Sequence, residues 1–483
     1  MSILSKLKSA MGFTPVHEVA GWGNRSRQWH PGNPGPISTG IAIGDALRIK
    51  SRDLVRRDCW ANASVEAFVS NAIATGIKPQ SMCADEAYRS AVLKLWQAWN
   101  EEADAAGITD FYGLQALATR SMCESGECFI RILPQPADSG LAVPLQLQLL
   151  EAEHVPLTLN TAYPNGNVVR SGIEFDKRGK RVAYHMYPFH PNDGAVGIVP
   201  ITNMVPVRVD ASEVLHLFRP LRPGQIRGES WLSRALVRLH ELDQYQDAEL
   251  VRKKTAAMFA GFITRQMPEE NMMGEGAAND AGLSFAGLEP GTMQLLEPGE
   301  DVKFSSPADV GASYSEFMKS QFRAVAAAMN ITYEQLTGDL SGVNYSSIRA
   351  GLLEFRRKCE AIQHGVIVHQ LCRPIWAAFV RQAVLSGALD ASDFASRPRD
   401  YLAAKWIPAG WQWVDPLKDA KAGIMAIRAG LMSRSEVIAG DGYDAEDIDR
   451  EIAADNARAD SFGFRFDSDP RWDIKAEQAP TVD

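Results

Sequence analysis

The pair Gly179-Lys180 is the nearest approach in this sequence to a nucleotide-binding loop. Such a loop has the pattern Gly-x-x-x-x-Gly-Lys-Ser/Thr, because its backbone N–H groups cradle phosphates, its lysine reaches them and its hydroxyl binds Mg²⁺. Here no second glycine stands at the required distance, and Arg181 occupies the position of the hydroxyl residue. We therefore predict that the chain is not an ATPase.

Two further segments carry metal-ligand residue types without the spacing that a metal site needs. His240-Glu241 begins like the helix of a zinc protease, but Gln244 stands where the second histidine belongs. Cys123 and Cys128 have no histidine at zinc-finger spacing, since the next one downstream is His154. We predict that both thiols are buried and that neither segment binds metal.

The two most polar segments lack the patterns of a nucleophile and of a calcium loop. Gly338-Asp-Leu-Ser-Gly342 places its serine fourth rather than third, and no nearby residue in the sequence would serve as its base. The acids between Asp441 and Asp449 lack the fixed alternation of a calcium loop and indicate the solvated start of a helix. The sequence thus predicts no catalytic residue, no metal and no cofactor.

Length and composition are those of an ordinary folded protein with more than one core. The chain has 483 residues, of which 46% are hydrophobic and 23% charged. Its formal net charge of -9 disfavours a conventional DNA-binding protein, although it does not exclude one along which DNA slides. The six scattered cysteines indicate reduced thiols. No run approaches the ~18 apolar residues of a membrane span, and the first residues lack a signal-peptide core.

The elements that must position these residues begin with a mixed region of helices and strands. Residues 41 to 110 carry apolar residues at helical spacing. Strand patterns follow over 128–133, 145–149, 172–176 and 181–187. The last two flank a tight turn and predict a hairpin, so the predicted fold class is α+β.

A long helix, a glycine-rich insert and a second helix come next. From Trp231 to Ala260 the chain has neither glycine nor proline and its leucines share one stripe. This pattern predicts a helix of about 30 residues and roughly 45 Å. Residues 261–311 contain eight glycines and four prolines between short apolar pieces, which predicts a small lobe of strands and loops. Helix resumes near Ser313, so the lobe is carried on two helices.

A polar loop separates this region from the last helices. Residues 336–345 hold two glycines and short polar side chains, which suit exposed and mobile backbone. The helix that follows, over 346–385, should kink near Pro374. Beyond it, the pattern predicts an extended piece over 406–413 and helices over 418–429 and 433–459.

The two ends of the chain lack a periodic core face. Residues 1–40 include a stretch rich in proline and glycine and are interpreted as an arm. The apolar residues at its start form either a docking helix for a neighbour or a short helix on their own domain. The periodicity is lost again from Phe462 onward.

Four short segments carry a distinctive combination of residues. They are Arg56-Arg-Asp-Cys-Trp-Ala-Asn62, Ser125-Gly-Glu-Cys-Phe129, Arg222-Pro-Gly-Gln-Ile-Arg-Gly-Glu-Ser-Trp-Leu232 and Tyr333-Glu-Gln-Leu-Thr-Gly-Asp-Leu-Ser-Gly-Val-Asn-Tyr-Ser-Ser347. Together and in this order they resemble the lambda-like family of phage portal proteins, over residues 45 to 460. The resemblance implies a ring, usually of twelve subunits, each with a mixed wing, a helical stem, a small β-containing clip, a tunnel loop and a helical crown.

The resemblance also implies how this chain is divided. The parts would be a flexible N-terminal arm (1–40), the wing (41–225), a stem helix (226–260), the clip (261–311), a second stem helix (312–332), the tunnel loop (333–345), a long kinked helix with the wing return (346–414), the crown (415–460) and a flexible tail (461–483).

The tunnel loop would then face the DNA. A channel needs weak, repeated contacts, so that no register of the duplex becomes a deep trap. Asp339, Ser341, Asn344 and Tyr345 are the candidates for such contacts. Arg349 and Arg356 are candidates for added basic character, although a solvated helix face or ion pairs between subunits explain them equally well.

The implied partners follow from the same resemblance. They are further copies of the chain in a dodecameric ring, double-stranded DNA without sequence specificity, the terminase large subunit, the major capsid or scaffold protein, and head–tail adaptor proteins, with no membrane. The implied location is a capsid vertex of the virion, with the host cytoplasm during assembly.

The main alternative function is that of a soluble enzyme, a hydrolase or nuclease with an unrecognised site. A capsid shell protein fits less well, because the long helix and its lobe suit a channel wall better than a flat tile.

Overall fold

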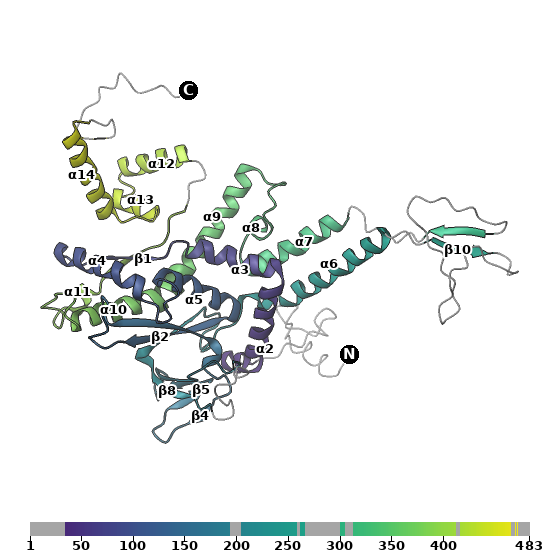
Figure 1. The fold of residues 1–483 in the computed structure, drawn as a ribbon, viewed down its shortest axis with the longest axis horizontal. Coiled ribbons are helices and arrows are strands. Elements are labelled where there is room, and N and C mark those ends of the chain that lie inside the picture. The colour runs from purple at the N-terminus through teal and green to yellow at the C-terminus, as the bar shows by residue number, and fades with distance from the viewer. Residues whose placement is uncertain are drawn as a thin grey trace, which may run out of the picture.

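The computed structural model describes residues 34–193, 204–257, 261–265, 300–304, 313–411, 416–464, 469 and 471. Figure 1 shows three regions: a body of helices and sheets, a two-helix arm that leaves it on one side, and a group of three helices above it. Residues 1–33 of the predicted arm, most of the predicted clip and most of the predicted tail lie outside the described residues. The division into portal parts remains a prediction.

Four helices build the first part of the body. They are α2 (Pro36–Arg57), α3 (Cys59–Ala72), α4 (Glu86–Glu102) and α5 (Phe111–Ser125). The aspartates Asp58, Asp85 and Asp110 each accept a backbone N–H of the helix that follows, which satisfies donors that helix starts leave unpaired. The start of α2 corrects the predicted arm, which ran to residue 40. Pro36 suits a first helical position because its fixed φ is helical and its missing N–H has no helical partner to lose.

The body has three layers: helices, a three-stranded sheet and a five-stranded sheet. The first sheet has the order β3 (Leu145–Glu151), β2 (Glu127–Pro134), β9 (Val214–Phe218). The second has the order β4 (Thr161–Ala162), β5 (Val168–Arg170), β6 (Ile173–Phe175), β7 (Arg181–Met186), β8 (Val207–Asp210). Short 3-10 turns at Ala152–His154, between β3 and β4, and at Ala211–Glu213, between β8 and β9, lie where the chain passes from one sheet to the other. The predicted strands and the β6–β7 hairpin are confirmed.

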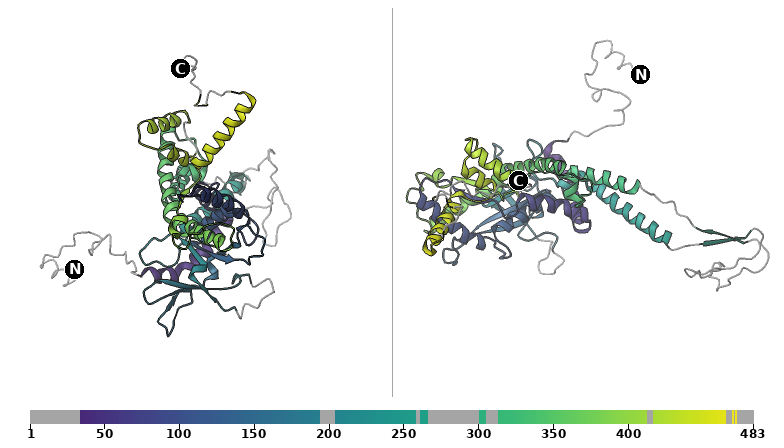
Figure 2. Two further views of the ribbon diagram at one scale, coloured as in Figure 1. Left: turned by 90° about the vertical axis from the view of Figure 1, so that its left-hand side faces the viewer. Right: turned by 90° about the horizontal axis from the view of Figure 1, so that it is seen from above.

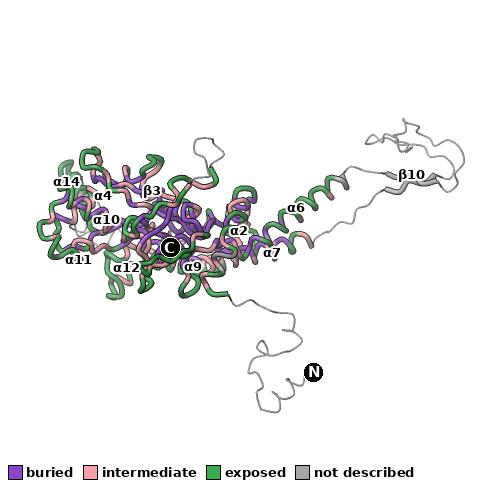
Figure 3. Tube along the Cα trace, turned by 90° about the horizontal axis from the view of Figure 1, so that it is seen from below, coloured by how far each residue is buried: buried purple, intermediate pink, exposed green. Residues whose placement is uncertain are grey.

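Alternation along β2 joins the layers. Cys128, Ile130 and Ile132 belong to the large hydrophobic core shared with the helices, whereas Phe129 packs into the core between the sheets. The large core contains a buried aromatic group in which Trp96 lies 5.0 Å from Phe379 and 4.9 Å from Trp99, centroid to centroid. Figure 3 shows buried residues concentrated in the body. The body is therefore a rigid base for what projects from it.

The arm consists of α6 (Leu236–Ala257) and α7 (Ser313–Met329), which lie side by side in Figures 1 and 2. Tyr245 of α6 stacks on Tyr314 and packs edge-on against Phe317 of α7, at 5.9 and 5.3 Å between centroids. Beyond the arm, β10 (Gly261–Arg265) and β11 (Glu300–Phe304) form an antiparallel pair. Two helices flanking strands were predicted, and this arrangement is confirmed.

The predicted start of the first arm helix was wrong. Residues Trp231–Arg234 form a 3-10 turn, and the α-helix begins only at Leu236. The Ser230 hydroxyl accepts the Leu232 N–H, and Trp231 and Leu232 are buried in the body, which holds this turn in the tighter form. The 22 residues of α6 that the structure describes give a length of about 33 Å, and the predicted end at 258–260 lies outside the described residues.

A continuous helical rod follows the arm and the short helix α8 (Tyr333–Thr337). It comprises α9 (Tyr345–Ile362), a π-helical segment (Gln363–Cys372) and α10 (Arg373–Leu385). The Arg373 N–H bonds to the Val368 carbonyl five residues earlier, so the irregularity ends where Pro374 removes the next donor. At the position where a kink was predicted, the structure has a π-helical segment on the N-terminal side of Pro374.

The last elements return to the body and then leave it. Helix α11 (Pro398–Tyr401) precedes β12 (Ala404–Ile407), which pairs with β1 (Lys78–Ser81). The final helices are α12 (Pro416–Arg428), α13 (Arg434–Gly440) and α14 (Ala445–Phe462). As predicted, the acidic segment starts a helix, because Asp444 caps α14 and Glu446 and Asp447 occupy its first turn. Among the helices that the structure describes, none combines the length and apolar character needed to cross a membrane.

Candidate functional site

The candidate loop consists of residues 338–344, which join α8 to α9 at the base of the arm. Part of the predicted loop is helical, because Thr332 and Gln335 form a reciprocal cap that starts α8. Gly338 ends that helix with a φ of 68°, a left-handed conformation that glycine adopts without strain. The exposed segment is therefore shorter than the predicted 333–345.

Asp339 organises the first half of this loop. Its carboxylate accepts the Ser341 hydroxyl at 2.6 Å, the Ser341 N–H at 3.0 Å and the Tyr333 hydroxyl at 3.2 Å. The hydrogen bonds from Ser341 are the main reason that the pKa of Asp339 lies below its usual value. The loop thus carries a fixed negative charge on a defined turn.

Asn344 holds the other end of the loop. Its side-chain oxygen accepts the Ser347 N–H at 2.9 Å, while the Ser347 hydroxyl accepts the Asn344 N–H at 3.2 Å. This reciprocal cap starts α9 at Tyr345, whose side chain lies outside what the structure describes. Between the two anchors, Leu340, Ser341 and Gly342 are exposed. Asp339, Ser341 and Asn344 are therefore brought together on one short, self-bonded turn.

The two candidate arginines lie on α9 and make contacts toward the C-terminal helices. Arg349 pairs with Asp419 of α12 at 3.1 Å. Arg356 lies over the Trp411 ring at 5.2 Å, and burial lowers its pKa. In this subunit, both arginines join α9 to the segment that carries α12.

A buried ion cluster behind β2 was not predicted from the sequence. One oxygen of Glu127 accepts hydrogen bonds from Arg48 at 3.0 Å and Arg227 at 2.8 Å. The other accepts the Gly228 N–H at 2.7 Å and lies 2.8 Å from His216 Nε2. All four side chains are buried. The signal in the sequence was a glutamate at the start of an apolar strand and an arginine in a glycine-rich loop.

The cluster fixes the protonation state of its members. Burial alone would raise the pKa of Glu127, but the charges of Arg227 and Arg48 and the His216 hydrogen bond hold it well below its usual range. Burial lowers the pKa of His216 to about 4, against the opposing effect of Glu127. Arg227 also donates to the carbonyls of Ala152, Val155 and Ser171. The cluster therefore ties both sheets to α2.

Two glycines allow the backbone crossing that forms this cluster. Gly126, with a φ of 90°, passes against the backbone of Glu229 and Ser230, and Gly228 passes against Gly126. A Cβ atom at either position would overlap main-chain atoms. The crossing brings the segments Ser125–Phe129 and Arg222–Leu232 together, although about a hundred residues separate them in sequence.

A group of metal-ligand residue types lies near the end of β3. Within the described part of the chain, Glu151, Glu153 and His190 are the one group of three whose ligand atoms converge. Arg52 already bonds Glu153 at 2.6 Å and pairs with Glu151 at 3.1 Å. Asn192 donates its N–H to His190 Nδ1, and His190 Nε2 lies 3.1 Å from Glu151. We interpret this group as an ion cluster.

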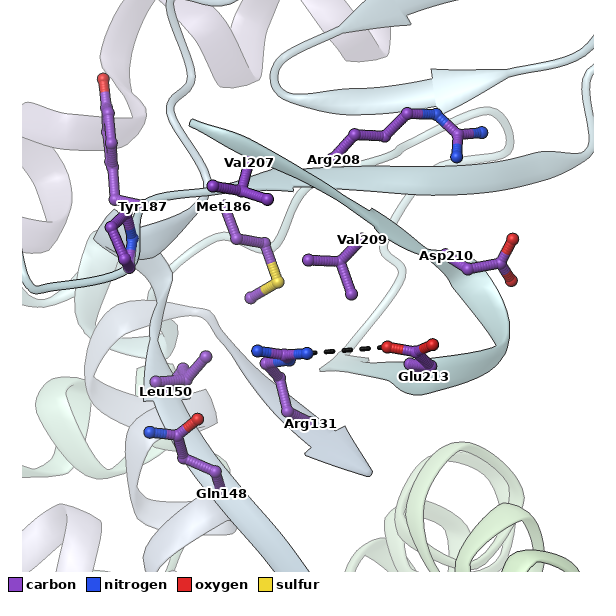
Figure 4. A pocket seen from close by; sticks show the side chains of 11 residues that line it. Arg131, Gln148, Leu150, Met186, Tyr187, Val207, Arg208, Val209, Asp210 and Glu213 are labelled. Carbon is purple, nitrogen blue, oxygen red and sulfur yellow. Dashed lines mark ion pairs between the residues drawn. The ribbon is translucent and has the colours of Figure 1, made fainter. Parts of the chain in front are cut away.

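A cavity of about 300 Å³ opens between the two sheets (Figure 4). Leu150, Met186 and Val209 form its apolar part, and Arg131 points across it toward Glu213, 3.6 Å away. The residues that line it include no serine, cysteine or histidine. The predicted buried thiols are confirmed for Cys123 and Cys128.

Comparison with known proteins identifies the family. The model of the phage portal protein, lambda family, matches residues 22–363. A probable portal protein of Halomonas phage phiHAP-1 is 30% identical over 387 residues, which cover 79% of this chain and 73% of that protein. Portal protein B of Escherichia phage lambda is 23% identical over 490 residues, covering 90% of this chain and 89% of that one.

Solved structures with a related arrangement are more distant. The neck of a native GTA particle, computed with C12 symmetry, has a TM-score of 0.44 and 17% identity, with 83% of this chain and 99% of that chain covered. An HK97 family phage portal protein from Corynebacterium diphtheriae has a TM-score of 0.33 and 12% identity, covering 74% and 94%. Because the family model matches residues 22–363 and the relative in phage phiHAP-1 is 30% identical, the chain belongs to the lambda family of phage portal proteins.

Proposed function

We propose that copies of this chain form a ring at one capsid vertex, through which double-stranded DNA enters during packaging and leaves during ejection. The observation that carries this proposal is the family match over residues 22–363, which spans the chain from α2 to α9 and so includes both arm helices and the loop 338–344. We propose twelve copies, the number implied by the resemblance to portal proteins. The ring acts as a conduit and performs no covalent chemistry.

We propose that the loop 338–344 faces the duplex. Its polar residues present one half-buried carboxylate, one exposed hydroxyl and one exposed amide, and it contains no basic residue. Because phosphate neutralisation by lysine and arginine produces tight, salt-dependent binding, such a loop would touch DNA without holding it. Arg349 and Arg356 would have to leave Asp419 and Trp411 to reach a phosphate. We therefore assign the DNA contacts to Asp339, Ser341, Asn344 and Tyr345.

The far end of the arm is the proposed docking site for other proteins. The β10–β11 pair lies at the end of α6 and α7, away from the body (Figure 1). There we place the terminase large subunit during packaging and the head–tail adaptor proteins afterwards. The major capsid or scaffold protein would contact the body. This puts the protein in the host cytoplasm during assembly and at a vertex of the virion afterwards.

The oligomeric state tests the ring. Mass photometry of the purified protein is expected to show one large species of about twelve times the 53.0 kDa subunit, and electron microscopy should show rings with a central hole. A stable monomer across salt concentrations would overturn the proposal. Nuclease and esterase assays on the same protein are expected to show no turnover.

Deletion of residues 338–343 tests the loop. We expect rings to form normally, because these six residues make hydrogen bonds almost entirely among themselves and with the adjacent helix ends. DNA packaging or retention in assembled particles should fall strongly. The matched control removes residues 136–141 from the exposed loop after β2 and should leave packaging unchanged. Loss of rings in the 338–343 deletion would show that the loop is structural.

A further inference from the structure

The three C-terminal helices, α12 to α14, lack a hydrophobic core of their own. Between Pro416 and Phe464, the described residues include only two buried side chains, Ala445 and Ala459. Large apolar side chains are exposed throughout, from 79% for Leu431 to 40% for Met432. The others are Leu417, Ile424, Met425, Tyr443, Ile452, Phe462 and Phe464. A helical unit with so little buried apolar surface is not stable by itself.

Polar contacts attach these helices to the body. Asp444 accepts the Gln80 amide at 2.5 Å, Glu446 pairs with Arg89 at 3.1 Å, and Asp419 pairs with Arg349. Such contacts orient the unit, but exposed ion pairs add little stability and cover little apolar surface. Something else must cover the apolar side chains.

Helix α12 presents a mixed apolar and basic stripe. Leu417, Lys421, Ile424 and Arg428 follow one another at intervals of four, three and four residues, and all four are exposed. The helix has three basic side chains and one acidic, so its formal charge is plus two. This stripe suits an apolar surface flanked by acids.

Helix α14 has the complementary character. Ala445, Ile448, Ile452 and Ala459 lie on one of its faces, and six acidic and two basic side chains give it a formal charge of minus four. In Figure 1, α14 stands beside α12 and α13, and the left view of Figure 2 shows α12 and α14 on different sides of the unit. Complementary surfaces on opposite sides of one subunit are what a head-to-tail ring contact requires.

We infer that α12 of each subunit packs on α14 of the next copy, so that the hydrophobic core of these helices exists only between subunits. The inference rests on the proposed ring and adds which helices meet, in which order, and by which charges. Lys421 and Arg428 would face the acidic side of the neighbouring α14, including the exposed Glu451. The unit would become ordered as the ring closes.

Disulfide trapping tests the contact. In a Cys59→Ser background, which removes the exposed native thiol, the Ile424→Cys and Ile452→Cys variants are prepared separately and together. Assembled from an equal mixture of the two single variants, rings should yield a cross-linked dimer on oxidation. The double variant should yield a ladder of covalent multimers. Pairing Ile424→Cys with Leu385→Cys, which is exposed on α10, is the control and should give neither.

The outcomes separate this inference from the ring itself. Rings that form without intersubunit cross-links, or cross-links confined to one chain, would overturn the α12–α14 contact and leave the ring standing. Absence of rings would overturn both. A second measurement needs no variant: amide exchange in α12 to α14 should slow by at least about tenfold in rings relative to dissociated subunits, and equal rates would contradict shared burial.

Charge reversal provides a third test of the contact. Lys421→Glu with Arg428→Glu should abolish the cross-link and the exchange protection, and Glu451→Lys in the same chain should restore part of both. Restoration by Glu451→Lys is specific to a contact between these helices. The control is Glu436→Lys, which should restore neither the cross-link nor the exchange protection. If Glu451→Lys also restores neither, the proposed charge pairing is contradicted.

Discussion

Glu127 shows what burial of charge demands of a single residue. Its carboxylate lies in the interior between Arg48, Arg227 and His216, where an unpaired charge would be strongly unfavourable. The surrounding donors compensate for lost hydration. Such a cluster adds little net stability when it is intact. Removing one partner is costly, however, because it leaves a buried charge unpaired.

Replacement of Arg227 by methionine should therefore be severe. The variant keeps much of the side-chain volume but leaves Glu127 with one arginine fewer and three carbonyls without their donor. We expect the free energy of unfolding to fall by about 3–5 kcal/mol, measured by denaturant titration. The control Arg397→Met removes an arginine from an exposed pair with Asp400 and should change stability by less than about 0.5 kcal/mol. Similar losses in both variants would contradict the role of the cluster.

His216 should make stability depend on pH in a defined window. Its pKa is lowered to about 4 in the fold from an ordinary 6.5, so between these values the unfolded chain binds the proton more readily. Stability is therefore fully present above pH 6.5 and falls as the pH drops toward 4, by at most about 3 kcal/mol. The depressed pKa of Glu127 adds a loss in the same direction at lower pH.

Unfolding titrations at pH 7 and pH 4.5 check this expectation. A His216→Gln variant keeps a donor toward Glu127 but cannot titrate, so its stability difference between the two pH values should be smaller than that of the native protein. An unchanged difference would show that other groups account for the pH dependence.

At the scale of elements, the crossing of Gly126 and Gly228 decides how the loop before α6 meets β2. Gly126→Ala should destabilise the body severely, because its Cβ would overlap the backbone of Glu229 and Ser230 in addition to the strain of a positive φ. The matched control is Gly140→Ala, which has a φ of 77° and open space around it. It should cost only about 1 kcal/mol. Equal Tm shifts for the two variants would contradict the tight crossing.

The sequence predicted elements where local pattern determines structure. Strand patterns predicted β2 and, by strict alternation, β3; the tight turn predicted the β6–β7 hairpin, and the absence of glycine and proline predicted most of α6. It erred where tertiary packing decides, as at the 3-10 turn of Trp231–Arg234. It missed the Glu127 cluster because its partners are separated by 79 to 100 residues, and only folding brings them together.

The candidate loop was found by pattern, but its internal order was not. Glycines and short polar residues indicated exposed backbone at 336–345. That Asp339 would bond Ser341 and Tyr333, and that Asn344 would cap α9, depends on side-chain geometry that spacing alone does not fix.

At the scale of the whole molecule, the acidic balance of the chain and the negative loop would both weaken the proposed contact with DNA. Asp339→Lys should tighten binding of duplex DNA to rings and steepen the dependence of log K on log[salt] by roughly 0.9 for each phosphate contacted. Asp339→Asn should have a smaller effect, because it removes the charge without reversing it. Fluorescence anisotropy at several salt concentrations measures both.

The control makes the same charge change elsewhere. Asp138→Lys lies in the exposed loop after β2, and it should leave DNA affinity unchanged within about twofold. If both lysine variants tightened binding equally, net charge rather than the position of the loop would govern DNA contact.

The paired helices of the arm also have a mechanical consequence. Helix α6 is about 33 Å long and packs on α7 through stacked aromatic rings. The pair therefore moves as one stiff element. A tilt of 10° at its root would carry the far end through about 6 Å, more than the diameter of a water molecule. A protein bound at that end would thus be displaced by several ångströms when the body rotates slightly. Conversely, movement of the bound protein would rotate the body.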